Sequence, residues 1–339
     1  MNSFLQYIEI YFPNNVLSNE QISLEHPEWS VDKISAKTGI KNRFIVSENE
    51  TSVDLAFNAA SLLLEKTNLR DKIDYILFCT QSPDYFLPTS ACILQDKLKL
   101  RNNIGALDFN LGCSGYVYGL GIAKGLIASG QAKNILLITA ETYSKLIHKD
   151  DKSNRTIFGD AATASIINSE ILSDGLNAQI GNFDYGTDGA GSEYLILKNG
   201  GFRNPHSKDN LKIDDDNNFV SDDNHLFMNG KEIFNFTATK IPDLLSSNLK
   251  SNNTQIENID LFIFHQANAF MLNFIRNKCK IPKEKFYVNM ENTGNTVSNT
   301  IPIALKYAQE ENKILKNQKI SLCGFGVGLS VGAVVLETK

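Results

Sequence analysis

One cysteine of the sequence has surroundings that suit a nucleophile. Cys113 lies in the segment NLGCSGYVYGLG (residues 110–121), where an expected strand ends and a helix rich in small residues begins. A thiol at a helix N-terminus faces the positive end of the peptide dipoles, which favours the thiolate. Gly112 and Gly115 permit a tight turn and a close approach of substrate to the backbone. The alternative is a buried structural cysteine, the commoner role of a single thiol.

A histidine and an asparagine could act together with this thiol. His265 follows the apolar run IDLFIF (259–264), and open α/β sheets gather functional groups at the carboxyl ends of their strands. Asn295 follows Gly294 in the segment NTGNT (292–296). Taken separately, the histidine could be a satisfied core residue and the asparagine an ordinary turn residue.

Short apolar runs between helical patterns must position these residues. Strands bounded by helices in alternation predict an α/β protein. The expected buried strands of the first half are residues 73–80, 103–110 and 134–141, and the expected helices are residues 52–66, with Ser52 as N-cap, and 115–130.

The second half of the chain repeats this order of elements. Residues 259–266 resemble 73–80 almost position by position, and residues 319–326 resemble 134–141. His265 then corresponds to Cys79, and Asn295 to Cys113, at nearly constant offsets. We therefore expect two duplicated α/β halves, residues 1–174 and 175–339, with chance similarity among apolar strands as the alternative.

The composition disfavours several classes of protein. The 33 Lys and Arg residues against 38 Asp and Glu give a formal charge of -5 without a basic block, which disfavours nucleic-acid binding. Five cysteines without C-x-x-C and five scattered histidines disfavour a disulfide framework and a zinc site. The N-terminus lacks the pattern of a signal peptide, and no apolar run approaches the roughly 20 residues that span a bilayer. We expect a cytoplasmic protein without metal or membrane partner.

One polar, acidic segment interrupts the α/β pattern at residues 203–225. The spacing of Asp214, Asp216 and Asp222 invites a calcium hypothesis, but the glycine and terminal glutamate of that loop type are absent. We expect a solvated surface loop or flap.

The motifs of the chain resemble those of β-ketoacyl-acyl carrier protein synthase III, a condensing enzyme of the thiolase superfamily. The resemblance covers nearly the whole length, and cysteine, His-Gln-Ala-Asn and Gly-Asn-Thr in this order are together specific. It implies a thiolase-like fold with layered αβαβα architecture and a homodimer. The matching segments are 37–43, 90–95, 110–120, 155–164, 226–237, 265–268, 292–305 and 324–336.

The resemblance implies a role for each of the residues singled out above. Cys113 is expected to carry the acyl group as a thioester, and His265 and Asn295 to donate hydrogen bonds to the enolate formed when a malonyl thioester loses carbon dioxide. The backbone N–H groups of Cys113 and Val327 are expected to hold the second oxyanion. Asn295 separates this chain from the related hydroxymethylglutaryl synthases, because an amide cannot abstract a proton as their glutamate does.

Several positions depart from the housekeeping members of the family. Lys33 and Lys37 replace a tryptophan and an arginine that contact the coenzyme A nucleotide, so a carrier protein or coenzyme A in a changed pose is expected as acyl carrier. Leu87 replaces a bulky aromatic residue that closes the acyl pocket across the dimer, which favours a longer or branched acyl group. Asn268 and Gly326 are expected along the pantetheine channel.

A basic stretch after the histidine motif suggests where a protein partner docks. Residues 273–285 include Arg276 and Lys278, which could steer an acidic acyl carrier protein. A solvated, lysine-rich helix end is the equal alternative.

We therefore expect decarboxylative condensation of an acyl thioester with malonyl-acyl carrier protein, without a cofactor beyond the coenzyme A or carrier thioesters themselves. One alternative transfers the acyl group from Cys113 to an alcohol or amine. Another is a non-catalytic partner subunit, against which the complete triad argues, and a hydrolase is a more distant alternative.

Overall fold

The first half of the chain forms a five-stranded sheet that ends beside the nucleophile. The computed structural model describes residues 2–208, 210–215 and 218–339. β4 is parallel to its neighbours β5 and β6, whereas β7 is antiparallel to β6 and β1. In spatial order the strands are β5 (Gly105–Phe109), β4 (Tyr75–Cys79), β6 (Asn134–Glu141), β7 (Ala161–Asn168) and β1 (Phe4–Tyr11).

The second half forms a sheet with the same strand order and directions. β13 is parallel to β14 and β15, and β16 is antiparallel to β15 and β8. Pairing of β1 with β8 at Phe4–Gln179 and Leu5–Ala178 joins the two sheets into one of ten strands. In spatial order the strands are β14 (Phe286–Tyr287), β13 (Leu261–Phe264), β15 (Lys319–Gly326), β16 (Ser330–Thr338) and β8 (Ala178–Thr187).

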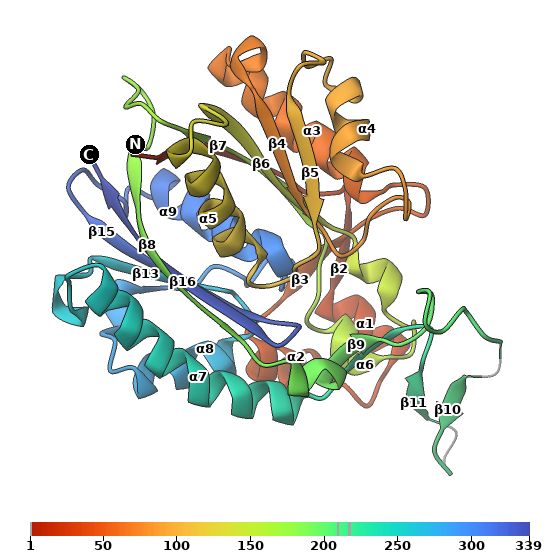
Figure 1. Cartoon of the computed structure of the whole chain (residues 1–339). Coiled ribbons are helices and arrows are strands. Elements are labelled where there is room, and N and C mark those ends of the chain that lie inside the picture. The colour runs from red at the N-terminus through yellow and green to blue at the C-terminus, as the bar shows by residue number, and fades with distance from the viewer. Residues whose placement is uncertain (1, 209, 216–217) are drawn as a thin grey trace.

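Three helical layers cover and separate these sheets, as Figure 1 shows. The central helices α5 and α9 lie between the sheets, α3 and α4 cover the outer face of the first, and α7, with α8 against it, covers the second. The layered αβαβα arrangement is thus confirmed. The helices are α3 (Ser52–Thr67), α4 (Ser90–Lys97), α5 (Gly115–Ala128), α7 (Gly230–Ser251), α8 (Ala269–Lys278) and α9 (Thr300–Glu310).

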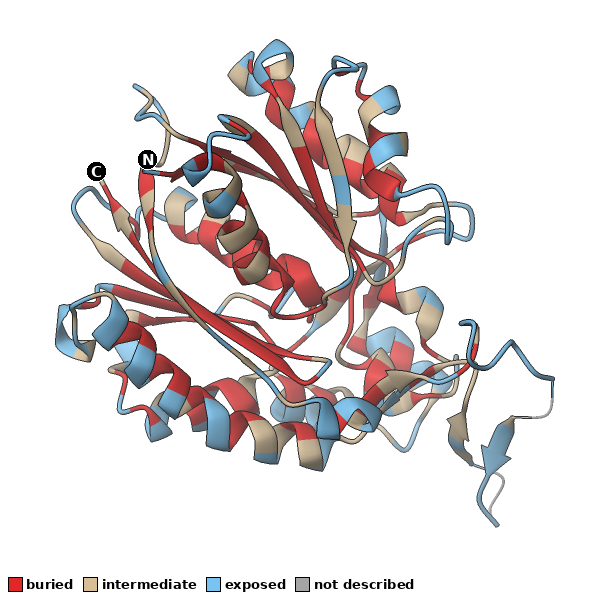
Figure 2. Cartoon of the chain, viewed as in Figure 1, coloured by how far each residue is buried: buried red, intermediate tan, exposed pale blue. Residues whose placement is uncertain are grey.

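Burial follows these layers (Figure 2). β6 and β7 are buried along almost their whole length because helices cover both faces of the sheet, which is why their sequences are mainly apolar or small. β5 differs from the buried strand that we expected. It is the edge strand of the first sheet, it is half-buried, and Leu107 is exposed.

The expected cap of α3 was wrong by one residue. Thr51, not Ser52, is the N-cap: its side chain accepts the N–H of Asp54, and the Asp54 carboxylate accepts the N–H of Thr51. Ser52 instead lies inside the helix, where its buried hydroxyl contacts Ser82. A capping box requires a side-chain acceptor three residues after the cap; Thr51 has Asp54 there, whereas Ser52 has Leu55.

Smaller elements lie outside the layers of the large sheet and its helices. The segment 203–225 contains a two-stranded hairpin that projects from the body (Figure 1), in agreement with the expected flap. Asp216 of the calcium hypothesis lies outside the described residues, and among the described residues no group of three metal-binding side chains occurs. These elements are β2 (Asn15–Ser18), α1 (Asn19–Glu25), α2 (Val31–Thr38), β3 (Asn42–Ile45), α6 (Lys152–Arg155), β9 (Leu195–Leu197), β10 (Leu211–Ile213), β11 (Phe219–Asp222) and β12 (Leu226–Met228).

No helix in the described part of the chain is both long enough and apolar enough to cross a membrane.

Candidate active site

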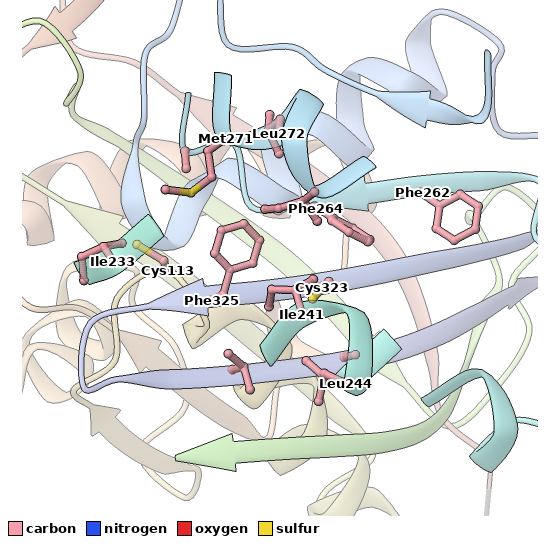
Figure 3. Close-up of a cluster of buried hydrophobic side chains, with 14 of the residues drawn as sticks. Cys113, Ile233, Ile241, Leu244, Phe262, Phe264, Met271, Leu272, Cys323 and Phe325 are labelled. Atoms are coloured by element: carbon pink, nitrogen blue, oxygen red, sulfur yellow. The ribbon is translucent and has the colours of Figure 1, made fainter. Parts of the chain in front are cut away.

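The turn between β5 and α5 buries the Cys113 side chain in the middle of the molecule. The Gly115 N–H donates to the Gly112 carbonyl at 2.8 Å, and α5 begins at Gly115. Cys113 is 5% exposed and lies beside Ile233 at one end of an apolar cluster that includes Phe325 (Figure 3). A Cβ on Gly326 would lie 2.7 Å from Cys113 Cβ and 2.8 Å from Sγ. Glycine at 326 is therefore a steric requirement of the nucleophile.

Two backbone N–H groups donate towards the Cys113 sulfur. They belong to Cys113 itself and to Val327, and both contacts lower the pKa of the thiol. These are the two donors expected for an oxyanion. A carbonyl carbon bonded to Sγ would carry its oxygen close to both.

The resting thiol is more strongly protonated than the sequence suggested. Burial, followed by the nearby Glu141 carboxylate, raises the pKa of Cys113 to about 12. The helix N-terminus favours the thiolate, but at this buried site desolvation outweighs the donated hydrogen bonds. Cys113 therefore needs a proton acceptor when it attacks.

His265 is a buried neutral imidazole at the carboxyl end of β13. The backbone N–H of His265 donates to the Cys323 carbonyl at 2.8 Å, which continues the pairing with β15. The ring Nδ1 lies 2.7 Å from Thr300 Oγ1. Phe325 packs edge-on against the ring at 5.3 Å. Burial lowers the pKa of His265 to about 3, so the ring is uncharged at neutral pH.

Asn295 is held against the first half of the chain. Its backbone N–H donates to the Ile157 carbonyl at 2.9 Å, and its backbone carbonyl accepts the Gly159 N–H at 3.0 Å. Gly294 has φ +68°, and a Cβ there would lie 2.8 Å from the Ile157 carbonyl oxygen. The Asn295 amide nitrogen then lies 3.5 Å from His265 Nε2.

One cavity of about 480 Å³ joins most of the expected site residues. Its inner end includes Cys113, His265 and Asn295, so the structure brings the three together from both halves. Asn268 and Gly326 also line it, and the Asn268 side chain caps α8 by accepting the Met271 N–H at 2.9 Å. The remaining lining residues are Lys37, Thr38, Ser153, Thr156, Ile157, Phe158, Leu195, Met228, Gly230, Lys231, Ile233, Phe234, Ala267, Phe270, Met271 and Phe325.

Four of the expected residues do not line this cavity: Val327, whose backbone N–H faces the Cys113 sulfur, and Leu87, Arg276 and Lys278. Leu87 is 80% exposed in the loop before α4. The Arg276 guanidinium donates to the Ile281 carbonyl and the Asn277 side chain, and Arg276 lines a different, smaller pocket. Lys278 is exposed, with its ammonium 6.0 Å from the centre of the Phe274 ring.

The cavity mouth contains residues that the sequence reasoning missed. Lys231 lines it together with Lys37, whose ammonium lies 5.2 Å from the centre of the Trp29 ring. Lys231 follows Gly230, the first residue of α7, within a recognisable motif, and this motif was the available signal. Phe270, two residues after the histidine motif, is exposed at the same mouth.

Glu141 is a buried carboxylate that the sequence reasoning also missed. It accepts hydrogen bonds from the Gln81 N–H at 3.0 Å, the Ser82 hydroxyl at 3.2 Å and the Ser298 hydroxyl at 2.9 Å. It therefore ties the loop after β4 to the loop that carries Asn295. Burial raises the pKa of Glu141 to about 8.

The geometry can support chemistry on a thioester. A thiol with two N–H donors at its sulfur is arranged for covalent acyl transfer, and a histidine and an amide beside it can handle a proton and a second oxyanion. The fold and these groups together define a thiolase-fold condensing enzyme.

Comparison with known proteins leads to the same class. Residues 107–189 match the family model described as 3-oxoacyl-[acyl-carrier-protein] synthase III, and residues 249–338 match its C-terminal model. The chain is 36% identical to β-ketoacyl-[acyl-carrier-protein] synthase III of Clostridium perfringens over 97% of each chain, and 35% identical to that of Natranaerobius thermophilus over 96% of each. The chain belongs to the β-ketoacyl-acyl carrier protein synthase III family.

Solved structures agree with this assignment. A 2.1 Å crystal structure of a 3-oxoacyl-(acyl-carrier-protein) synthase III is 44% identical, with a TM-score of 0.94 over 99% of each chain. A 3-oxoacyl-(acyl-carrier protein) synthase from Burkholderia xenovorans is 32% identical, with a TM-score of 0.90 over 100% of this chain and 94% of that one.

Proposed function

We propose that this protein catalyses the decarboxylative condensation of an acyl thioester with malonyl-acyl carrier protein. The observation that carries the proposal is the convergence of Cys113, His265 and Asn295 at the inner end of one cavity. Family membership supports the same reaction, since its named members are β-ketoacyl-acyl carrier protein synthases. The reaction needs no resident cofactor.

The first half-reaction loads the enzyme. Cys113 Sγ attacks the carbonyl carbon of the acyl thioester, and the carbon–sulfur bond to the carrier breaks. The thiol proton leaves with the carrier as its free thiol. The N–H groups of Cys113 and Val327 hold the transient oxyanion, and a single donor of this kind typically contributes about 2.7–4 kcal/mol to the transition state.

The second half-reaction forms the new carbon–carbon bond. The malonyl carboxylate leaves as carbon dioxide, and the electron pair of the broken bond forms an enolate. The Asn295 amide nitrogen is the ready donor for the enolate oxygen, and His265 assists when Nε2 carries a proton. The enolate carbon then attacks the acyl-Cys113 carbonyl, and the sulfur leaves and regains a proton.

We also propose that the active form is a homodimer paired through β5. β5 is the edge strand of the sheet and pairs only with β4 among the described strands, and Tyr85, Phe86 and Leu87 of the loop after β4 are between 62% and 80% exposed. An exposed strand edge beside large apolar side chains is usually covered by another chain, because it would otherwise leave backbone groups unpaired and apolar surface in water. Leu87 would reach an acyl site only from a partner chain, since it does not line the cavity of its own chain.

For the carrier protein we propose docking at the cavity mouth. Lys37 and Lys231 line the mouth, whereas Arg276 is engaged within its own chain and Lys278 lies further along α8. Cations at the mouth would attract an acidic carrier before its pantetheine arm enters.

Mass spectrometry tests the function. The protein is incubated with coenzyme A and carrier-protein thioesters of several acyl groups, and the acyl-enzyme is weighed. Malonyl-carrier protein is then added, and carbon dioxide is measured together with the product. We expect an acyl adduct that Cys113→Ala abolishes and carbon dioxide release that matches the product. An adduct on the alanine variant would overturn the assignment, and acyl transfer to an alcohol or amine without carbon dioxide would replace it.

A further inference from the structure

Arg43 of β3 is a fully buried arginine, a position that charged side chains rarely occupy. Its guanidinium donates to the Thr156 carbonyl at 2.6 Å, the Leu17 carbonyl at 3.3 Å and the Lys41 carbonyl at 3.4 Å. Among the described residues no carboxylate accepts a hydrogen bond from it, and its Nε has no acceptor. Burial lowers the pKa of Arg43 to about 10, so the group remains a cation at neutral pH. The fold therefore buries a positive charge whose hydrogen-bond partners are backbone carbonyls.

The stem of Arg43 packs against the turn that carries Asn295. A Cβ on Gly294 would lie 3.0 Å from Arg43 Cγ, and a Cβ on Gly159 would lie 3.3 Å from Arg43 Cβ. Gly294 directly precedes Asn295, and Gly159 donates the N–H that the Asn295 carbonyl accepts at 3.0 Å. The stem thus contacts the chain on both sides of the hydrogen bonds that hold Asn295.

The guanidinium of Arg43 fixes the segment to which Asn295 is hydrogen-bonded. Thr156, whose carbonyl accepts the 2.6 Å hydrogen bond, immediately precedes Ile157, whose carbonyl accepts the Asn295 N–H at 2.9 Å. A shift of Thr156 would move Ile157 with it, because neighbouring residues share a planar peptide unit. The 3.5 Å between the Asn295 amide nitrogen and His265 Nε2 therefore depends on where Arg43 holds this segment.

The backbone of β3 holds the two sides of this arrangement together. The Lys41 N–H donates to the Glu291 carbonyl at 2.6 Å, in the turn of the second half. Further along, the Phe44 carbonyl accepts the Asp160 N–H at 2.8 Å, in the segment of the first half. Arg43 lies between these two attachments, so its side chain enters where the two halves of the chain meet.

We propose that Arg43 is a positioning residue of the decarboxylation step, because it holds Asn295 where the amide can donate to the enolate oxygen. This inference rests on the proposed function. The Cys113 thiol and the Val327 N–H belong to the turn before α5 and the turn after β15, whereas Arg43 contacts β2, the segment after α6 and the Asn295 turn. Loss of the guanidinium should therefore impair decarboxylation more than acyl transfer to Cys113.

Two substitutions of Arg43 separate its stem from its guanidinium. Arg43→Met keeps an apolar stem and donates no hydrogen bond, so the Thr156 carbonyl loses this donor. Arg43→Lys keeps the charge and a donating group but lacks the planar fork. Arg101→Met is the matched control: the Arg101 guanidinium donates to the Ile73 carbonyl at 2.9 Å, and Arg101 is exposed before β5, at the end opposite to the Cys113 turn.

Each half-reaction has its own assay. In a Cys113→Ala parent, malonyl-carrier protein loses carbon dioxide, and the enolate takes a proton from water to give acetyl-carrier protein. With Cys113 present, acyl-enzyme formation is followed by mass spectrometry. We expect Arg43→Met to slow decarboxylation about 10- to 100-fold and acylation less than about 3-fold, with a smaller selective loss in Arg43→Lys. Arg101→Met should leave both rates within about 3-fold of the parent.

A double-mutant cycle tests whether Arg43 acts through Asn295. Asn295→Ala removes the amide whose position Arg43 sets. Adding Arg43→Met to Asn295→Ala should slow decarboxylation by less than about 3-fold further, because the effects of residues that act through one another are not additive. A further loss as large as in the parent, or equal losses of acylation and decarboxylation in Arg43→Met alone, would overturn the proposal.

Hydrogen exchange gives a readout that needs no activity. Peptides that cover residues 156–160 and 293–297 should exchange faster in Arg43→Met than in wild type, whereas the peptide around Cys113 should not change. Unchanged exchange in both segments would overturn the proposal. A Cys113→Ala protein that releases no carbon dioxide would instead refute the proposed function, and exchange would still show whether Arg43 holds the turn. If Arg43→Met does not fold, Arg43→Lys carries the same measurements with the same expected selectivity.

Discussion

Adding one methyl group at Gly326 should disable the nucleophile although the change removes no polar group. No positive φ constrains this glycine, so Gly326→Ala has a permitted backbone and its effect is steric. The new Cβ would lie 2.7 Å from Cys113 Cβ and 2.8 Å from Sγ, well inside normal carbon–carbon and carbon–sulfur contact. Relief requires the thiol or the end of β15 to move by several tenths of an ångström.

The expected cost has two parts. Overpacking of this kind typically destabilises a core by about 1–3 kcal/mol. Displacement of Sγ from the N–H groups of Cys113 and Val327 weakens the oxyanion contacts, and the loss of one such donor typically slows the reaction about 10²- to 10³-fold. Gly326→Ala should therefore fold, with a lower free energy of unfolding, and acylate about 100-fold more slowly.

A second glycine provides the matched control. Gly125 lies exposed in α5, and a Cβ there would meet nothing within 4 Å. Gly125→Ala should leave acylation unchanged and stabilise the protein by about 0.5–1 kcal/mol, the usual gain at a helix interior. The assays are the rate of acyl-enzyme formation by mass spectrometry and urea unfolding. Acylation of Gly326→Ala within about 3-fold of wild type would refute the steric reasoning.

Three further predictions concern stability and docking. Thr51→Ala removes the capping box of α3 and should lower the free energy of unfolding in urea by about 1 kcal/mol; no change would mean that the cap contributes nothing. The pKa of Glu141 is raised to about 8 in the folded state, so the folded chain holds this proton where the unfolded chain does not, and stability should fall as pH rises from about 5 to 8. Glu141→Gln should flatten that decline in urea unfolding at several pH values, and an unaltered slope would contradict it. Lys231→Glu should raise the KM for carrier-protein substrate and spare a small thioester, whereas Lys278→Glu should have the smaller effect; equal changes for both substrates would reject docking at the mouth.

Much of the architecture could be predicted because the apolar pattern is a local signal. Residues 135–138 are an apolar run since helices cover both faces of β6, and the structure shows a strand there. The pattern could not distinguish the edge strand β5 from a buried one, because both contain a short apolar run. The half boundary that we proposed at 174 falls in the connection between β7 and β8.

Charge and chemistry near the site were harder to predict. Arg276 and Lys278 were predicted to dock the carrier because they lie in a basic stretch of sequence. In the structure the Arg276 guanidinium donates to the Ile281 carbonyl of the chain that follows α8. Cys113 was expected as a thiolate from its position before a helix. Burial raises the pKa of the Cys113 thiol, and the extent of burial depends on all the residues that pack around it.

The sequence by itself determined the residues of the site, because Cys113, His265 and Asn295 each lie in a local motif at the end of a strand or turn. It also determined the family and the repeated α/β order. The tertiary structure alone decided how deeply Cys113, His265 and Asn295 are buried and which groups surround them. Those properties arise from hydrogen bonds and desolvation between segments distant in the chain, and no local pattern of residues encodes them.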